Sequence, residues 1–263
     1  MPGLNSLEDS GNLRGLPWML AISQVAGIAM VVMIGVWLNT YLGGFAWDGG
    51  PKEFNLHPLC MICGMVFLYG EAALVYRVFR NSRKLKVKLI HAGLLFLAFF
   101  AIIIGLVAVF SFHRANNIAN LYSLHSWCGI TTVIMFCFQL LLGFLTFLFP
   151  GARSSLRSTY LPIHQFFGGA ILVLAAISSI SGINEKLFFV YAKDPKNPDK
   201  VTYPQLPGGA VFGNVCGLVV VAFVFLILFI IQRSEWKRPT DPEEEALSIH
   251  FRRVVSQGSE DSG

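Results

Sequence analysis

The sequence predicts an all-α membrane protein with six transmembrane helices. Its 263 residues are 54% apolar and only 13% charged, and the mean hydropathy is +0.61, which is too apolar for an ordinary soluble domain. The charged residues also cluster, leaving apolar runs that approach or exceed the roughly 20 residues needed to cross a bilayer as a helix. Six such runs are found, at about 18–38, 56–78, 89–112, 124–149, 161–182 and 209–231.

The first apolar run follows a polar leader, residues 1–17, which we place in the cytosol. This run is longer than the core of a signal peptide and has no small-residue cleavage pattern after it, so we expect it to be retained as a helix. Residues 18–232 then form one membrane domain. The charged segment 233–263 is expected to be a disordered cytosolic tail.

Lysine and arginine are distributed unevenly between the predicted loops. The segment "YRVFRNSRKLKVK", between the second and third helices, is strongly basic, and most of the 20 lysines and arginines fall on the same side of the membrane as this loop. Cytosolic loops carry the excess of positive charge in membrane proteins. Both termini are therefore expected in the cytosol, and the net charge of +5 requires no nucleic-acid partner.

Four histidines lie near the N-terminal ends of the second to fifth helices, one in each: His57, His91, His125 and His164. Because consecutive helices run in opposite directions, His57 and His125 are expected near the lumenal face and the other two near the cytosolic face. Ionisable residues inside a membrane are costly and point to function. Two histidines at equal depth on non-neighbouring helices suit the two axial positions of a haem. The pattern therefore predicts a central four-helix bundle that holds two haems.

Other kinds of site compete with this interpretation. Zinc normally needs three or four protein ligands, and no carboxylate or thiol accompanies both pairs. A proton-coupled transporter could use the histidines as a relay, and it would contain no chromophore. A quinone-oxidising cytochrome b would place two histidines on each of two helices, which this pattern does not do. The "CMIC" cysteines lie within a helix, and we expect them to serve packing.

Cations surround the predicted cytosolic histidines: Arg77, Lys84, Lys88 and Arg157. Lys84 and Lys88 share one helical face with His91, whereas Lys86 points elsewhere. Such a cationic mouth would hold haem propionates and attract a small anionic reductant. Simple positive-inside bias with lipid headgroup contacts explains the cluster equally well.

The lumenal side carries polar residues just before His125: His113, Arg114, Asn116, Asn117, Asn120, Tyr122 and Ser123. Glu185 follows His164 by about 31 Å of helix, which brings it to the same lumenal end. Glu71 is expected to pair with Arg77 or another base at the cytosolic end. In the sixth helix, Gly209, Gly213 and Gly217 form a doubled G-x-x-x-G, which predicts a close-packing face.

Several motifs resemble the ascorbate-dependent transmembrane cytochrome b561 family: "FNLHPLCM", "ALVYRVFR", "LIHAG", "NIANLYSLHSW", "PIHQFFG" and "SEWKRP". The resemblance implies a lumenal haem b ligated by His57 and His125 and surrounded by Asn120, Leu121, Tyr122, Ser123 and Glu185. It implies a cytosolic haem b ligated by His91 and His164, with Arg77 and Lys84 near its propionates. It also assigns Lys84, Lys88 and Arg157 to cytosolic ascorbate and His113 to the lumenal acceptor.

The family resemblance further implies a homodimer that moves single electrons from cytosolic ascorbate to a lumenal acceptor. "FPGARSSLRS" and "EEEALSIHF" are similar to the secretory-vesicle (chromaffin granule) branch, whose acceptor is monodehydroascorbate. "SGINEKLFF" is more similar to the lysosomal or late endosomal branch, which, like the cell-surface relatives, reduces ferric iron. We expect the secretory-vesicle role, with a transmembrane ferric reductase as the alternative.

Overall fold

The computed structural model describes residues 13–149 and 152–238, and within these ranges the chain is helical and contains no strand. Six helical segments are long and apolar enough to cross a membrane, which confirms the predicted fold class. Their bounds are Leu16–Tyr41, Pro51–Val78, Lys84–Ala115, Leu124–Leu148, Ser154–Val190 and Gly208–Gln232.

Three of the six spans are divided into shorter helical elements. The first consists of α1 (Leu16–Val36) and the π-helical η1 (Trp37–Tyr41). The second consists of α2 (Pro51–Phe54), α3 (Leu56–Met61), the π-helical η2 (Ile62–Leu68) and α4 (Tyr69–Val78). The fourth consists of α6 (Leu124–Gly143) and the π-helical η3 (Phe144–Leu148). The remaining elements are α5 (Lys84–Ala115), α7 (Ser154–Val190), the 3₁₀ helices η4 (Tyr203–Gln205) and η5 (Ser234–Trp236), and α8 (Gly208–Gln232).

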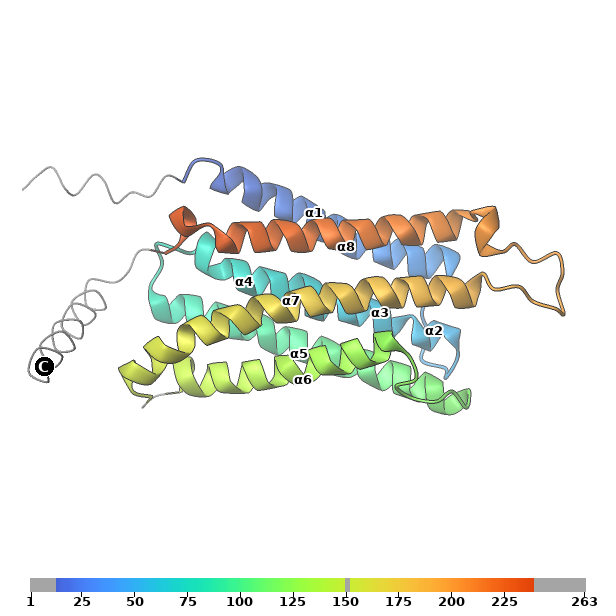
Figure 1. The fold of residues 1–263 in the computed structure, drawn as a ribbon, viewed down its shortest axis with the longest axis horizontal. Helices are drawn as coiled ribbons and strands as arrows, with labels where there is room; N and C mark the ends of the chain where they lie inside the picture. The colour runs from blue at the N-terminus through green and yellow to red at the C-terminus, as the bar shows by residue number, and fades with distance from the viewer. Residues whose placement is uncertain (1–12, 150–151, 239–263) are drawn as a thin grey trace, which may run out of the picture.

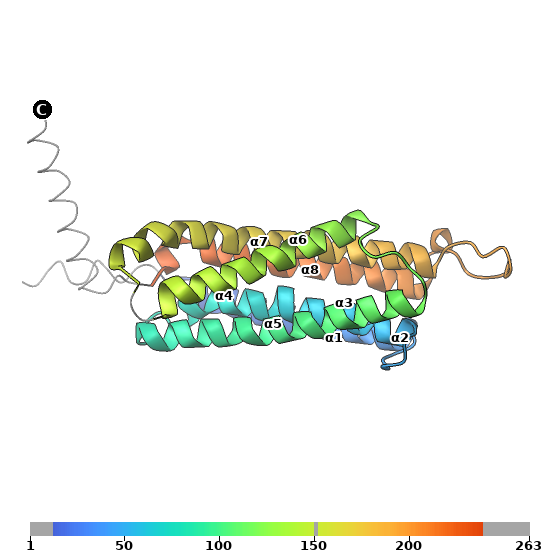
Figure 2. The ribbon, with the colours of Figure 1, turned by 90° about the horizontal axis from the view of Figure 1, so that it is seen from below.

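The spans lie side by side along one long axis (Figure 1). α1 packs against α8 at one edge, whereas α5 and α6 lie at the opposite edge. Figure 2 shows α6 and α7 facing α3, α4 and α5 across the bundle. The second to fifth spans therefore form a central four-helix bundle, and the first and sixth flank it.

Two helices extend well beyond the predicted apolar runs. α5 begins at Lys84 rather than near residue 89, and α7 covers Ser154–Val190 rather than 161–182. The apolar run marks the part of a helix that crosses hydrocarbon, whereas the hydrogen-bonded backbone continues through polar residues at each end. Both extensions bring charged side chains onto the same rigid helices as the histidines.

The chain remains folded a short way past the predicted end of the membrane domain at residue 232. η5 places Trp236 against Phe229, with ring centroids 5.8 Å apart, and the Arg233 guanidinium lies 4.8 Å from the Phe229 ring. Trp236 is buried. Residues 234–236 of the predicted tail are therefore helical, and its segment 239–263 lies outside the described residues.

The predicted glycine face of α8 packs against the first span of the same chain. Trp37 Nε1 donates to the Gly209 carbonyl at 2.8 Å. A Cβ added at Gly213 would lie 3.0 Å from the Trp37 ring, whereas one at Gly217 would meet nothing within 4 Å. Close packing is thus observed at the first two glycines.

The expected pairing of Glu71 with a base is wrong. Gln24 of α1 donates its side-chain amide to both carboxylate oxygens of Glu71, at 2.8 and 2.9 Å. Arg77, the expected partner, instead donates to the Ile231 carbonyl of α8. The helical rotation from residue 71 to residue 77 is 600°, so the two side chains leave α4 in different directions.

Replacing Gln24 with leucine is expected to destabilise the protein by about 1–2 kcal/mol, because the half-buried Glu71 carboxylate loses its hydrogen-bond donor. The thermal unfolding midpoint in detergent measures this effect. The double variant Gln24→Leu with Glu71→Leu removes the orphaned carboxylate and should recover most of the loss. A double variant no more stable than the single one would contradict this account.

Candidate haem sites

Two pairs of histidine rings face each other across the bundle. His57 of α3 and His125 of α6 have ring centroids 6.2 Å apart, and His91 of α5 and His164 of α7 have ring centroids 6.3 Å apart. An imidazole nitrogen lies about 1.1 Å from its ring centre and binds a first-row metal at about 2.0–2.1 Å, so two imidazoles sharing one ion have centres about 6.3 Å apart. Both pairs therefore fit axial ligation of one iron each.

Three of these rings donate their Nδ1 hydrogen to a backbone carbonyl. The acceptors are Gly105 for His57 at 3.1 Å, Ala72 for His91 at 2.8 Å and Ser178 for His125 at 2.9 Å. Because a carbonyl oxygen only accepts, Nδ1 carries the hydrogen and Nε2 keeps the lone pair that a metal needs. These bonds also fix the orientation of each ring.

His164 is held differently from the other three. Its Nδ1 is buried and has no hydrogen-bond partner among the described residues. The ring packs instead against Phe147 and Tyr160, with centroids 5.2 and 5.9 Å away. Gln139 of α6 donates to the backbone carbonyl of His164 at 2.6 Å. His164 lies two residues after Pro162, which is inside α7. Aromatic packing and this backbone bond therefore position the fourth ring.

Glycine lies directly against one histidine of each pair. A Cβ added at Gly182 would lie 2.6 Å from His125 Cε1, and a Cβ added at Gly143 would lie 2.9 Å from His164 Cε1. Real Cβ atoms essentially never approach another heavy atom so closely. The two rings occupy their positions because these helices carry no side chain there.

The pairs lie toward opposite ends of the bundle. His57 and His125 stand near the starts of α3 and α6, at the end where α5 finishes, and His91 and His164 lie toward the opposite end, where α5 and α7 begin. Among the described residues, no group of three or more histidine, cysteine or acidic side chains could hold a metal ion. Each site is thus a pair of histidines, an arrangement that fits a haem held between two imidazoles better than a zinc ion.

The lumenal residues predicted around His125 form one connected cluster. Ser123 is the N-cap of α6, where its Oγ accepts from Ser126 N at 3.3 Å and donates to Glu185 of α7 at 3.0 Å. His113 Nδ1 lies 3.1 Å from Asn120 Oδ1. Leu121 has a left-handed backbone, with φ of 55°. The cap fixes the helix start that carries His125, and Glu185 ties this start to α7.

Tyr122 connects the two parts of this cluster. Its ring lies 6.2 Å from the His113 ring and 6.5 Å from the Phe189 ring. Partial burial, together with the hydrogen bond and negative charge of Glu185, raises the pKa of Tyr122 to about 12. The phenol therefore stays protonated at neutral pH and remains a hydrogen-bond donor.

Two of the predicted cytosolic cations converge on the end of η3. Lys88 of α5 donates to the Phe147 carbonyl at 3.1 Å, and Arg157 of α7 donates to the Thr146 carbonyl at 3.2 Å. Cations stabilise helix C-termini, where carbonyl groups lack partners. Lys84 begins α5 one turn earlier. The Phe147 ring also contacts His164, so this cationic group lies next to the cytosolic pair.

Comparison with known proteins now assigns the family. The sequence model described as eukaryotic cytochrome b561 matches residues 56–190, which include all four paired histidines. The chain belongs to the eukaryotic cytochrome b561 family. This confirms the resemblance seen in the sequence motifs, and membership of the cytochrome b561 family implies haem b as the cofactor.

Curated relatives of this cytochrome b561 cover nearly its whole length. It is 47% identical over 247 residues to the transmembrane ascorbate-dependent reductase CYB561 of Sus scrofa, which covers 94% of each chain. The human protein of that name is 44% identical over 244 residues, covering 93% of this chain and 94% of its own. The lysosomal membrane ascorbate-dependent ferrireductase CYB561A3 of Mus musculus is 51% identical over 218 residues, covering 82% of this chain and 88% of its own.

Several aromatic residues beside the histidines of this cytochrome b561 were not singled out from the sequence. The Phe54 ring lies 6.1 Å from His57, and the Tyr76 ring lies 5.5 Å from His91. Phe54 stands three residues before its histidine, and Tyr160 stands four before His164. An aromatic residue one helical turn before His57 and before His164 was therefore a signal available in the sequence.

Proposed function

We propose that this protein transfers single electrons from cytosolic ascorbate through two b haems to lumenal monodehydroascorbate. The observation that carries this proposal is the presence of two histidine pairs with the spacing of bis-imidazole ligation, toward opposite ends of one membrane bundle. A haem held by each histidine pair would supply a one-electron carrier, and ligation by two imidazoles would favour electron transfer over oxygen chemistry. Relatives named as ascorbate-dependent reductases support the choice of donor.

Different side chains would act at the two ends of the bundle. His57 and His125 hold the lumenal haem, and His91 and His164 hold the cytosolic haem, with Arg77 and Lys84 near its propionates. Lys84, Lys88 and Arg157 attract the ascorbate anion and position it beside the cytosolic pair. On the other side, Asn120, Leu121, Tyr122, Ser123 and Glu185 surround the lumenal haem, and His113 borders the acceptor.

The orientation and location follow from the same proposal. The basic loop between the second and third spans faces the cytosol, so both termini are cytosolic. We place the protein in a secretory-vesicle membrane as a homodimer, where it would regenerate lumenal ascorbate. A ferric reductase of the lysosomal membrane is the second candidate, and the identity to a lysosomal ferrireductase favours it.

A reduced-minus-oxidised spectrum of the purified protein tests the proposal. We expect a b-type α-band and two haems per chain. A proton-coupled transporter with a histidine relay would show no such band, and a content near one haem per chain would also contradict the proposal.

Vesicles loaded with ascorbate and carrying the protein with its cytosolic face inside then allow monodehydroascorbate and ferric chelates to compete as acceptors. Preference for ferric chelates would select the second candidate.

Removing two cations of the cytosolic cluster is expected to slow reduction by ascorbate about tenfold. The variant combines Lys84→Ala with Lys88→Ala and removes two positive charges from the proposed docking face. Reduction by dithionite should still reach both haems, which separates docking from haem binding. Lys86→Ala is the matched control, because it removes a charge from the same helix but from another face. Equal ascorbate rates in all three proteins would refute the docking role.

A further inference from the structure

Lys186 lies near the lumenal end of α7 without a counter-ion in the described part of the chain. Its Nζ lies 4.0 Å from the centre of the Phe54 ring. The carboxylate next to it in sequence, Glu185, bonds instead to Ser123 on α6. No acidic group within residues 13–149 and 152–238 forms an ion pair with Lys186. A half-buried ammonium group is therefore held on an aromatic face with no anion beside it.

Phe54 places this charge beside both the lumenal histidine pair and the proposed acceptor site. Its ring lies 6.1 Å from the His57 ring and 5.2 Å from the Phe112 ring. The Phe112 ring in turn lies 6.0 Å from the His113 ring, in a tilted arrangement. The Phe54 ring thus lies between Lys186 and the proposed haem ligand His57. Through Phe112, it also connects Lys186 to His113, the residue proposed to border the acceptor.

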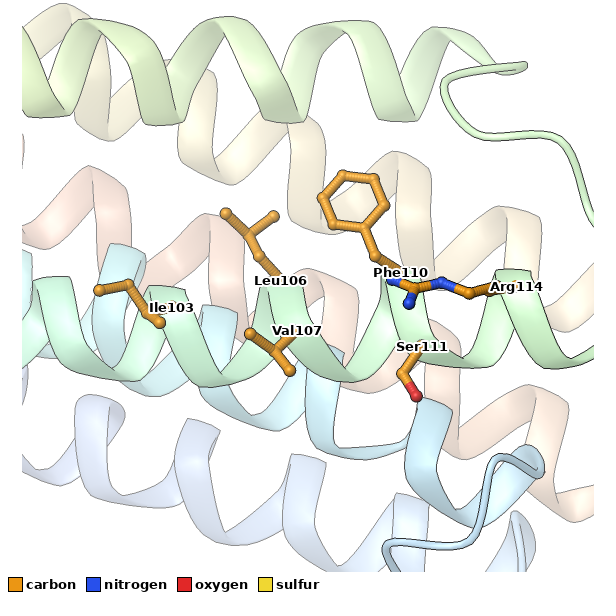
Figure 3. A pocket seen from close by; sticks show the side chains of 6 residues that line it. All are labelled: Ile103, Leu106, Val107, Phe110, Ser111 and Arg114. Carbon is orange, nitrogen blue, oxygen red and sulfur yellow. The ribbon is translucent and has the colours of Figure 1, made fainter.

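Arg114, near the end of α5, points to a different surface. Arg114 lines a groove of about 440 Å³ on α5, shown in Figure 3. The other residues that line this groove are Ile103, Leu106, Val107, Phe110 and Ser111. Arg114 is two residues from Phe112, so a rotation of about 200° places it on the opposite face of α5. Of Arg114 and Lys186, it is therefore Lys186 that lies on the Phe54 side of α5.

An unpaired cation in a partly desolvated site attracts anions more strongly than a solvated one. We propose that Lys186 is the anion-recognition group of the lumenal acceptor site and selects electron acceptors that present negatively charged oxygen. Monodehydroascorbate and ferric carboxylate chelates meet this requirement, whereas cationic ferric complexes do not. This inference rests on the proposed function and names a specificity residue for it.

The test compares acceptors of opposite charge with Lys186→Met and Lys186→Arg in vesicles that expose the lumenal face. Ferric citrate is the anionic probe, and hexaammineruthenium(III) is the cationic probe. Lys186→Met should raise KM for ferric citrate about tenfold, with little change for the cation, and Lys186→Arg should restore the lower KM. Lys193→Met is the matched control, because it removes a charge from an exposed position on the same side.

A redox titration of the lumenal haem provides a readout independent of turnover. We expect at most a small lowering of the midpoint potential in Lys186→Met, because one positive charge is lost near the haem site, together with the raised KM for ferric citrate. A shifted potential with an unchanged KM would place Lys186 on a haem propionate and overturn the proposal, as would equal KM changes for both probes. Driving the reaction with dithionite instead of ascorbate keeps the test valid on its own. Failure with ascorbate alone would count against the proposed donor, not against Lys186.

Discussion

Replacing His125 with alanine is expected to lower the haem content of the purified protein from two per chain to about one. The variant removes one of the two proposed iron ligands, and the partner ring, His57, would be left to hold the iron alone. His57→Ala should give the same result. The remaining haem should keep the spectrum and potential of the cytosolic site, because His91 and His164 lie at the other end of the bundle. Pyridine haemochrome assay and redox titration measure both quantities.

The reciprocal variants provide the control for this prediction. His91→Ala and His164→Ala should remove the cytosolic haem and leave the lumenal one. Imidazole added to a His125→Gly variant should restore part of the lost band, since a small ligand fills the space of the missing ring. Loss of both haems in every variant, with no recovery by imidazole, would show that the histidines support folding rather than separate sites.

The arrangement of spans and histidine pairs was accessible to sequence reasoning for a physical reason. Hydrocarbon demands long apolar helices, and short loops force neighbouring spans to run in opposite directions. Depth in the membrane then follows from position in the span, so His57 and His125 had to fall at one end and His91 and His164 at the other. The observed ring distances agree with that placement.

The contacts between side chains were not accessible in the same way. Periodicity gives the face of a helix on which a residue lies, but it does not give the rotation of that helix against its neighbours. Glu71 was expected to pair with a base at the same end of the bundle, whereas in the structure it accepts hydrogen bonds from Gln24. Lys186 was given no role from the sequence, because its position over Phe54 depends on how the end of α7 lies relative to α2.

The two ends of the bundle differ in charge in a way that suits a direction of electron flow. At the cytosolic end, Lys88 and Arg157 surround the end of η3 beside His164. At the lumenal end, Glu185 accepts a hydrogen bond from Ser123 at the N-cap of α6, and the Lys186 ammonium lies over the Phe54 ring. Under the proposed function, positive charge would concentrate the ascorbate anion at the first end, and Lys186 would provide one anchoring point for an acceptor at the second.

Gly182→Ala is expected to disrupt the lumenal haem although the variant changes no ligand. The added Cβ would lie 2.6 Å from Cε1 and 2.9 Å from Nδ1 of His125, so the ring must move. Movement would break the 2.9 Å bond from Nδ1 to the Ser178 carbonyl and turn Nε2 away from the axis shared with His57. We expect loss of about one haem per chain, or a lumenal midpoint potential shifted well outside error.

Gly169→Ala is the matched control for this steric argument. It lies on the same helix, α7, and its added Cβ would meet only Leu228 Cδ2 at 4.0 Å, an ordinary van der Waals contact. Haem content and both potentials should therefore be unchanged, and stability should rise slightly because alanine favours the helix. Were Gly182→Ala to behave like Gly169→Ala, the His125 ring would not depend on the missing side chain for its position. The two variants therefore test whether the lumenal site depends on the close approach of α7 to the His125 ring, in addition to the presence of the histidine itself.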